Sequence, residues 1–304
     1  MNHPSPPTIA PSAVQRWGRV ASQASPWLHE EVARRMEERL QWIVLQPKAW
    51  LDWAPARGGL EAHQRLLARY PKATCHVHEP FAVDLAQARQ RHEPAWWQPA
   101  RWVGPASHLG LPAPGGVQMV WSNMALHLSD QPRALMDAWH ESLEVGGFLM
   151  FSCLGPDTLK ELRALYADAG WPEPGPAFTD MHDWGDMLVE AGFAEPVMDM
   201  ERIVLSYESP ERLLQELRDL GRNLNPGRFP AVRGRGWLAE LKRRLQTHAA
   251  LTEPAPGRLS LTFEIIYGHA FKPAPRIRLA PESAVSLEQM KTVLRQGKKN
   301  LPPV

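Results

Sequence analysis

The chain has 304 residues, of which 44% are hydrophobic, and its formal net charge is +1 with histidine neutral. This length and composition fit one large α/β domain or two smaller ones. The nearly balanced charge argues against bulk attraction to nucleic acid or to an anionic membrane, and the sequence holds no nucleic-acid motif. Two cysteines are too few for a disulfide framework, and no apolar run is long enough to span a bilayer. We therefore expect a cytoplasmic protein that is neither secreted nor inserted in a membrane.

The N-terminal part is predicted to be an arm followed by helices. Residues 1–13 are rich in proline and polar side chains, which is typical of a disordered segment. A strong helix is predicted to begin at Ser25, with apolar residues on one face and charges on the other. The charged face is most simply solvent-exposed, with ion pairs such as that between Glu31 and Arg35.

The first half of the chain then alternates apolar runs with helical patterns. We predict strands at 50–53, 73–79 and 101–104. Helices are predicted between them, at 62–70 and from the end of the second strand through Arg89. His76 and His78 alternate on the second of these strands. No third ligand lies near them, so we expect no metal site.

The stretch from Val117 to Leu154 has the clearest pattern. An apolar run at Val117–Ser122 is rich in β-forming residues, a helical pattern covers Ala134–Leu143, and a second apolar run covers Phe148–Leu154. A strand, a crossover helix and a second strand form a parallel pair that is buried on both faces.

The last part of the chain adds helices, two strands and a tail. The predicted elements are helices at 157–163 and 181–191, a strand at 196–207, amphipathic helices at 211–224 and 237–248, and a strand at 258–271. The chain beyond Lys272 is rich in proline and then basic. We expect this tail to be loosely ordered.

These elements resemble the class I S-adenosylmethionine-dependent methyltransferase fold. The loop at 122–127 is similar to the one that follows the fourth strand of that family. The resemblance implies an α/β, Rossmann-like sheet of seven strands, the last of them antiparallel, with a helical cap at about 209–250 between strands six and seven. It also implies one methyltransferase-like domain at 14–272, flanked by the disordered arm at 1–13 and the tail at 273–304.

The resemblance implies a site for S-adenosylmethionine after the first strand. In the family this strand ends in a G-x-G-x-G loop, and the register here gives Ala54, Ala56 and Gly58. Methyl groups at the first two positions restrict φ and move the chain away from a ligand. Asp52 holds the place of the acidic residue at the end of the strand. Arg57 brings a positive charge that the family does not usually place there.

Three further residues are candidates for cofactor binding. Glu79 lies about 20 residues past the loop, the spacing at which an acidic side chain accepts hydrogen bonds from ribose hydroxyls. A helix-capping role for this residue, before Pro80, is equally compatible with the sequence. Ser122 and Asn123 end the fourth strand at the edge where open α/β sheets bind ligands.

The second half of the chain resembles one family within this fold. Four segments look like malonyl-acyl-carrier-protein O-methyltransferase of biotin synthesis, namely 122–127, 157–162, 217–221 and 261–267. That family methylates the free carboxylate of a malonyl thioester on an acyl carrier protein, and so leads towards pimelate. The segments 27–32 and 157–163 look as much like a mitochondrial complex I assembly factor that hydroxylates an arginine, and the sequence leaves both branches open.

Methyl transfer to a carboxylate has modest chemical needs. An ionised carboxylate requires no general base, but it needs precise positioning and a cation to hold it. Arg218 and Arg222 on the first cap helix could hold the carboxylate, while Tyr267 on the last strand and His127 after the fourth could orient the thioester. The arginines are otherwise surface charges, Tyr267 a core aromatic residue and His127 a helix cap.

The carrier protein of this family is acidic, which implies a basic docking surface. Lys242, Arg243 and Arg244 on the second cap helix would supply it. The oligomeric state is not indicated by the sequence.

A function of a different class stays open. The loss of two glycines favours a non-catalytic relative that binds a carrier or partner protein through its cap. Asp52 and Glu79 favour an enzyme, and alanine can replace glycine where φ stays negative. We therefore expect an enzyme.

Overall fold

In this computed structural model, the described residues are 6, 8–22, 24–92, 107–252 and 257–275. Met1–Pro273 forms one compact unit, and Ala274–Val304 is separate from it. The strands of the first unit are β1 (Ala49–Trp53), β2 (Thr74–His78), β3 (Ser107–Leu109), β4 (Val117–Ser122), β5 (Leu143–Leu154), β6 (Ala194–Tyr207) and β7 (Leu259–Phe271).

Helices cover the sheet and form the cap. They are α1 (Pro11–Trp17), α2 (Trp27–Arg39), α3 (Pro55–Gly58), α4 (Leu60–Arg69), α5 (Ala82–His92), α7 (Pro132–Ser142), α8 (Lys160–Asp168), α9 (Met181–Glu190), α10 (Pro210–Leu220), α11 (Arg235–Thr247) and α12 (Ala249–Thr252), with 3₁₀ turns η1 (Leu40–Trp42) and η2 (Leu126–Leu128). None of the helices in the described part of the chain combines the length and apolarity that a membrane span needs.

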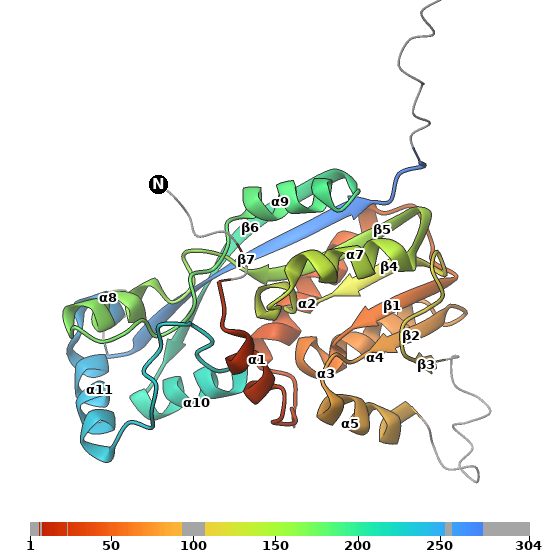
Figure 1. Cartoon of the computed structure of the whole chain (residues 1–304). Coiled ribbons are helices and arrows are strands. Elements are labelled where there is room, and N and C mark those ends of the chain that lie inside the picture. Colours follow the sequence, from red (N-terminus) through yellow and green to blue (C-terminus); the bar gives the residue numbers. More distant parts are fainter. Residues whose placement is uncertain (1–5, 7, 23, 93–106, 253–256, 276–304) are drawn as a thin grey trace, which may run out of the picture. The chain divides into compact units, whose positions relative to one another are not determined.

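The strands form one seven-stranded sheet in the order β3-β2-β1-β4-β5-β7-β6 (Figure 1). β1 to β5 pair in parallel, whereas β7 runs antiparallel to both β5 and β6. The predicted α/β sheet with an antiparallel last strand is therefore confirmed. The third strand differs in position, because the predicted stretch 101–104 lies outside the described residues and β3 is Ser107–Leu109.

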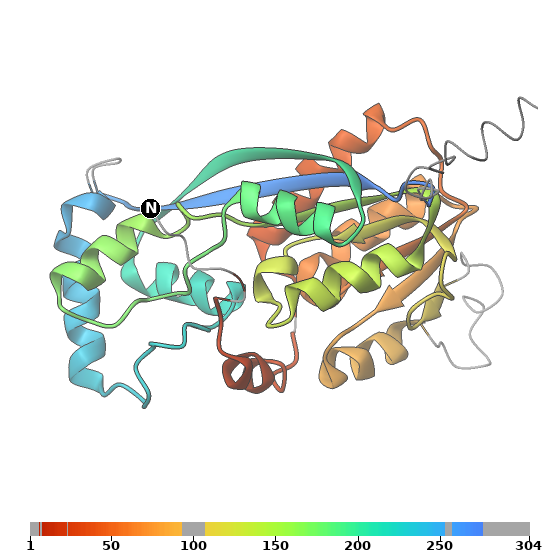
Figure 2. The same cartoon turned by 45° about the horizontal axis from the view of Figure 1, so that its top comes forward.

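Both faces of the sheet are covered by helices (Figure 2). Alternate residues of one strand face opposite layers: Trp50 packs in the core under α2 and α4, and Leu51 in the core under α7 and α9. Trp121 and Phe148 belong to the first core, and both are almost completely buried. Each such side chain contributes about 1.5–3 kcal/mol to stability when it leaves water. This double burial explains the continuous apolar runs in the sequence.

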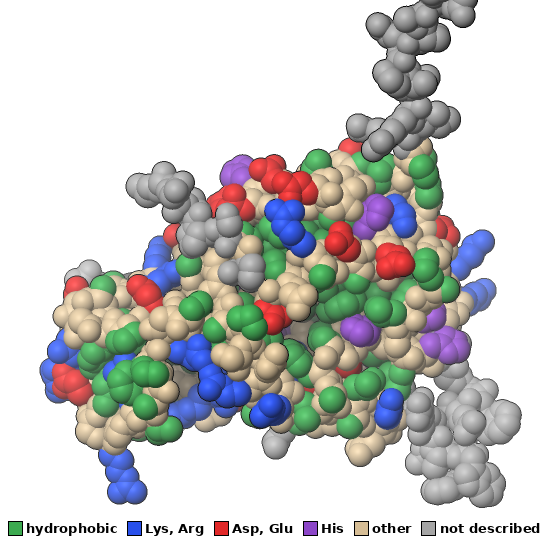
Figure 3. Space-filling model, viewed as in Figure 1, with side chains coloured by type: hydrophobic (Ala, Val, Ile, Leu, Met, Phe, Trp, Pro, Cys, Tyr) green, Lys and Arg blue, Asp and Glu red, His purple; other side chains and the backbone are tan. Residues whose placement is uncertain are grey.

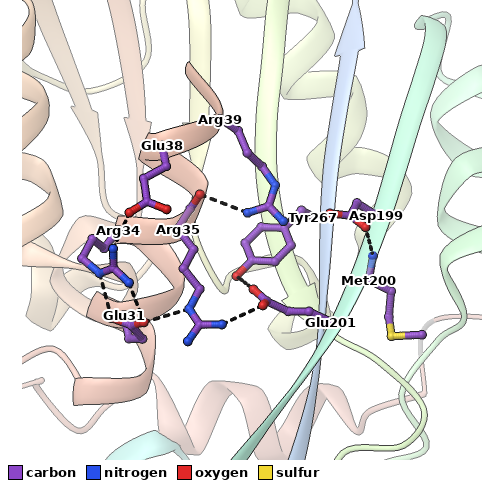
Figure 4. Close-up of polar contacts among 9 residues, drawn as sticks. All are labelled: Glu31, Arg34, Arg35, Glu38, Arg39, Asp199, Met200, Glu201 and Tyr267. Atoms are coloured by element: carbon purple, nitrogen blue, oxygen red, sulfur yellow. Dashed lines mark hydrogen bonds and ion pairs between the residues drawn. The ribbon is translucent and has the colours of Figure 1, made fainter. Parts of the chain in front are cut away.

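The charged face of α2 forms the expected ion pairs. Arg35 Nε lies 2.8 Å from Glu31 Oε1, and Arg34 also binds Glu31. Hydrogen bonds from these guanidinium groups, Arg34 first, lower the pKa of Glu31 to about 2. The predicted pair between Glu31 and Arg35 is confirmed, and Figure 4 shows that Arg35 also reaches Glu201 of β6.

The helical cap lies between β6 and β7, as predicted. Ser209 accepts a hydrogen bond from the backbone N–H of Arg212, and Pro210 occupies the first turn of α10. These are strong helix-start signals. The cap is joined to the main core by buried Leu213 and Leu241.

The prediction of a disordered arm at 1–13 is wrong for its last part. Ile9 is 4% exposed, and the backbone N–H of Ala10 donates to the carbonyl of Leu224, 2.8 Å away. α1 then begins at Pro11. The apolar residues of this segment pack against the loop after α10, a long-range contact that composition does not reveal. The predicted tail lies outside the described residues from 276 onwards.

Candidate active site

The loop after β1 replaces the expected glycine turn with a short helix. Ala54 has φ 59° and ψ 45°, so the expectation that φ stays negative is wrong there. A non-glycine residue in this left-handed region costs roughly 1–2 kcal/mol. Ala54 is held by two hydrogen bonds, from its N–H to the carbonyl of His78 (2.7 Å) and to its own carbonyl from the N–H of Gly58 (2.9 Å).

Gly58 is needed because another loop lies very close to it. A Cβ at this position would lie 2.6 Å from the backbone oxygen of Asn123. The Asn123 amide donates to the carbonyl oxygens of Gly58 and His29, and its Oδ1 accepts from Ser152 Oγ at 2.6 Å. Asn123 therefore ties α2, α3 and β5 to the end of β4 and does not present a free amide to a ligand.

Glu79 is held by the same loop. It is 5% exposed, and its Oε1 accepts a hydrogen bond from the backbone N–H of Ala56 at 2.8 Å. Its Oε2 is buried without a hydrogen-bond partner among the described residues. Burial raises the pKa of this carboxyl from 4.5 to about 8. A buried acceptor without a partner is costly and is a group that a ligand hydroxyl can satisfy.

A cavity of about 700 Å³, the strand-edge cavity, opens at the carboxyl ends of β1 and β4. Its wall includes Trp17, Trp53, Ala54, Arg57, Gly58, Pro80, Phe81, Asn123, Met124 and Gln131. This is the edge where open α/β sheets bind ligands, and the volume suits a nucleoside-sized molecule. The apolar and aromatic lining fits the adenosyl part of S-adenosylmethionine. Glu79 is not itself a lining residue, but its chain neighbour Pro80 and its hydrogen-bonded loop, at Ala54 and Gly58, are, so a small shift of its side chain would bring Oε2 to the cavity.

Arg57 lies in the wall of this cavity. Its Nε is 2.5 Å from Asp84 Oδ2, and its Nη2 donates to the carbonyl of Val20 at 2.7 Å. The guanidinium carbon lies 3.9 Å from the centre of the Trp17 ring and 4.6 Å from that of Phe81. Sequence reasoning noted the unusual charge of Arg57 but did not place these partners.

Two further cavities follow the strand-edge cavity. The arginine cavity, about 460 Å³, is lined by residues that include Trp17, His29, Arg57, Arg218, Leu220 and Arg222. The apolar cavity, about 450 Å³, is lined by residues that include His127, Leu154, Leu214, Leu217, Arg218, Leu220, Arg222, Trp237 and Phe263. Trp17 and Arg57 line both of the first two cavities, and Arg218, Leu220 and Arg222 line both of the last two. Leu128 lines both the strand-edge cavity and the apolar cavity, so each of the three cavities adjoins the other two.

Arg218 and Arg222 are exposed at the end of α10. Neither forms an ion pair with a carboxylate among the described residues; Arg222 Nη1 donates to the carbonyl of Arg218 at 2.6 Å. Figure 3 shows Lys and Arg side chains gathered over α10 and α1. The structure thus brings both predicted arginines to one cavity and leaves their charges available.

The predicted docking residues on α11 are already paired. Lys242 lies 2.8 Å from Glu211, while Arg243 and Arg244 bind Glu240 at 2.7 and 2.6 Å. These carboxylates offset the positive charge that was expected to attract a carrier. Arg218 of α10 and Arg222, just after it, have no carboxylate partner among the described residues and are the better candidates for that role.

Two histidines are buried near the cavities. His127, in η2, accepts a hydrogen bond from the N–H of Leu154 at 3.3 Å, and burial lowers its pKa to about 3. His29, which sequence reasoning did not assign a role, lies 2.8 Å from the carbonyl of Arg57 through Nδ1, and burial lowers its pKa to about 4. Both imidazoles are neutral at pH 7. The position of His29 on the buried face of α2 was the signal that could have identified it.

Three predicted site residues lie elsewhere. Tyr267 donates to Glu201 at 2.5 Å, and Arg39 lies 3.8 Å from the centre of its ring, on the α2 side of the sheet (Figure 4). Asp52 is 2% exposed and lies 2.7 Å from His63, and burial raises its pKa. Ser122 is fully buried. None of Tyr267, Asp52 and Ser122 lines the three adjoining cavities, so we assign them no contact with substrate or cofactor.

Comparison with known proteins identifies the family. No family model matches the chain. It is 39% identical over 274 residues to the malonyl-acyl-carrier-protein O-methyltransferase of Gallionella capsiferriformans, which covers 86% of this chain and 91% of that protein. The protein of the same name from Laribacter hongkongensis is 38% identical, over 83% and 84%. The chain belongs to the malonyl-acyl-carrier-protein O-methyltransferase family.

A solved structure was also compared with this methyltransferase. Phosphoethanolamine N-methyltransferase 2 of Haemonchus contortus, in complex with S-adenosyl-L-methionine, is 15% identical, with a TM-score of 0.45 over 86% of this chain and 56% of that one.

Proposed function

We propose that this protein transfers the methyl group of S-adenosylmethionine to the free carboxylate of a malonyl thioester on acyl carrier protein, in the biotin (pimelate) pathway of the cytoplasm. Membership in the family supports the reaction class and the acceptor. The observation that carries the proposal is the group of three adjoining cavities, because a methyl donor, a carboxylate and a thioester arm must also lie next to one another.

The strand-edge cavity suits the cofactor. Glu79 would accept a hydrogen bond from a ribose hydroxyl through its partnerless Oε2, while Trp53 and Phe81 would cover the apolar surface of the adenosyl group. Bound there, S-adenosylmethionine supplies an electrophilic methyl group. The protein contributes position and the exclusion of water, which account for most of the rate in such a reaction.

The arginine and apolar cavities suit the acceptor. Arg218 and Arg222 can hold the malonyl carboxylate, since an arginine fork binds two carboxylate oxygens together. The apolar cavity would take the thioester and the start of the carrier's arm, beside neutral His127. The exposed arginines also attract an acidic carrier, and this long-range attraction weakens as salt is raised.

The proposal is tested by incubating the protein with S-adenosylmethionine and malonyl-acyl carrier protein and detecting the methyl ester by mass spectrometry. Malonyl-coenzyme A serves as an acceptor without the carrier, and acetyl-acyl carrier protein as one without the carboxylate. We expect methylation of both malonyl thioesters and none of the acetyl one. Cofactor binding without any methylation would instead support a binding protein.

A further inference from the structure

Arg57 stands between the cavity proposed for the methyl donor and the one proposed for the acceptor. It lines both, and Trp17 is the other residue that does so. The residue is 8% exposed, whereas Arg218 and Arg222, which also line the arginine cavity, are exposed. Arg57 is therefore the cation that lines both the cavity proposed for the methyl donor and the cavity proposed for the acceptor carboxylate.

The guanidinium of Arg57 is fixed but not fully used. Asp84, the carbonyl of Val20 and two aromatic rings hold it, whereas its Nη1 makes no hydrogen bond with a described residue. A rigid guanidinium with a free amino group is well prepared to bind a carboxylate, because little side-chain entropy is lost. Asp84 is completely buried and offsets the charge, so the pair does not repel a cationic donor strongly.

We propose that Arg57 binds the acceptor carboxylate from the cofactor side and directs one of its oxygens towards the methyl group. This inference rests on the proposed function. Arg218 and Arg222, which line the same arginine cavity, then hold the acceptor together with Arg57. The position of Arg57 makes it a determinant of specificity for an anionic acceptor.

The chemistry gives this role a distinct kinetic signature. The acceptor oxygen gives an electron pair to the methyl carbon, the carbon–sulfur bond breaks with its pair remaining on sulfur, and no proton moves. The carboxylate loses its negative charge as the ester forms, so Arg57 attracts the reactant more strongly than the transition state. Removing the guanidinium should therefore raise KM much more than it lowers kcat.

The test compares Arg57→Gln and Arg57→Lys with Arg65→Gln as a control. Arg65 is bound to Glu37 at 2.9 Å and lines none of the cavities. Dissociation constants are measured for malonyl-coenzyme A, for its methyl ester and for S-adenosylmethionine. We expect Arg57→Gln to weaken the binding of malonyl-coenzyme A by about tenfold or more, the range of one charged hydrogen bond. The dissociation constants of the methyl ester and of the cofactor should not change.

Arg57→Lys should weaken the binding of the same substrate by a smaller factor. It provides the same test if Arg57→Gln does not fold. Equal weakening of the thioester and its ester, or a loss of cofactor binding, would overturn the inference and leave Arg57 as a structural residue. These outcomes differ from failure of the proposed function, in which the parent protein binds malonyl-coenzyme A but does not methylate it, or binds neither thioester.

Discussion

Cofactor affinity should depend on pH through Glu79. A ribose hydroxyl donates most strongly to an ionised carboxylate, but burial raises the pKa of Glu79 to about 8 in the free protein. The group must therefore lose its proton when the cofactor binds near neutral pH. The apparent dissociation constant then equals its limiting value multiplied by one plus the ratio of protonated to ionised Glu79.

The magnitude follows from the pKa. With a value of about 8, affinity should be roughly twofold below its limit at pH 8, about tenfold below at pH 7 and about a hundredfold below at pH 6. Glu79→Gln keeps an acceptor for the N–H of Ala56 but cannot ionise. Its affinity should be weaker than that of the parent above pH 8 by about tenfold or more, the value of a charged hydrogen bond, and independent of pH.

The stability of the free protein should change in the opposite direction. Between pH 4.5 and about 8 the unfolded chain releases this proton while the folded chain retains it, so stability falls as pH rises. The stability lost by pH 7 amounts to at most about 3 kcal/mol, and the rest is lost as pH rises through about 8. Glu79→Gln should therefore be more stable than the parent at pH 7 and equally stable near pH 4.

The assays are calorimetric titration with S-adenosylmethionine from about pH 6 to 9 and thermal unfolding from about pH 4 to 9. Titrations in buffers of different ionisation enthalpy count the proton released on binding, which should be close to one at pH 7 for the parent and zero for Glu79→Gln. Parallel pH profiles for the two proteins would refute the assignment of Glu79 to the cofactor. If Glu79→Gln loses the pH dependence but keeps the affinity of the parent above pH 8, the contact between Glu79 and ribose is refuted, whereas the link between Glu79 ionisation and binding stands.

Three further changes test the loop and the cap. Gly58→Ala should lower the free energy of unfolding by about 1–3 kcal/mol in urea titrations, because its Cβ would lie 2.6 Å from the Asn123 oxygen; an unchanged value would mean that the two loops can separate. Ala54→Gly should leave the free energy of unfolding nearly unchanged, because relief of the positive φ offsets the added entropy of the unfolded chain. Ala56→Gly should lower it by about 1 kcal/mol, because Ala56 lies in a helical turn. Equal losses for the two variants would contradict this reasoning. Arg218→Lys should slow transfer to malonyl thioesters without changing cofactor affinity, and Arg243→Lys, paired with Glu240, should not; equal effects would remove the cap arginine from the site.

The sheet was largely predictable because its strands are buried on both faces. Val117–Ser122 was predicted as a strand and is one, since burial demands a continuous apolar run there. The start of β5 was missed. Val145 and Gly146 are exposed, and Gly146-Gly147 is typical of a turn, so no burial pattern marks this stretch as strand. β3 was also misplaced, since a strand of three residues carries little pattern.

Periodicity predicts which residues share a face, but not which face carries the site. Tyr267 follows the alternation of β7 and was expected near the acceptor, yet its side belongs to the core under α2. The roles of Arg57 and His29 depend on contacts between residues that are far apart in the sequence. Arg57 contacts Asp84, 27 residues away, and His29 contacts Arg57, 28 residues away. A single sequence records the residue types at such contacts but not the pairing.

The altered glycine loop is compatible with a working cofactor site for a physical reason that differs at each position. At Ala54 the left-handed conformation is retained at a modest cost, because its N–H and C=O both have partners. At Ala56 the methyl group is fully buried, and the backbone N–H is already used by Glu79. At Gly58, where a side chain would strike the backbone of Asn123, glycine has been kept. The chain therefore carries methyl groups only where its own packing accepts them, and Glu79 can hold Ala56 through Oε1 while its Oε2 is left for a ribose hydroxyl.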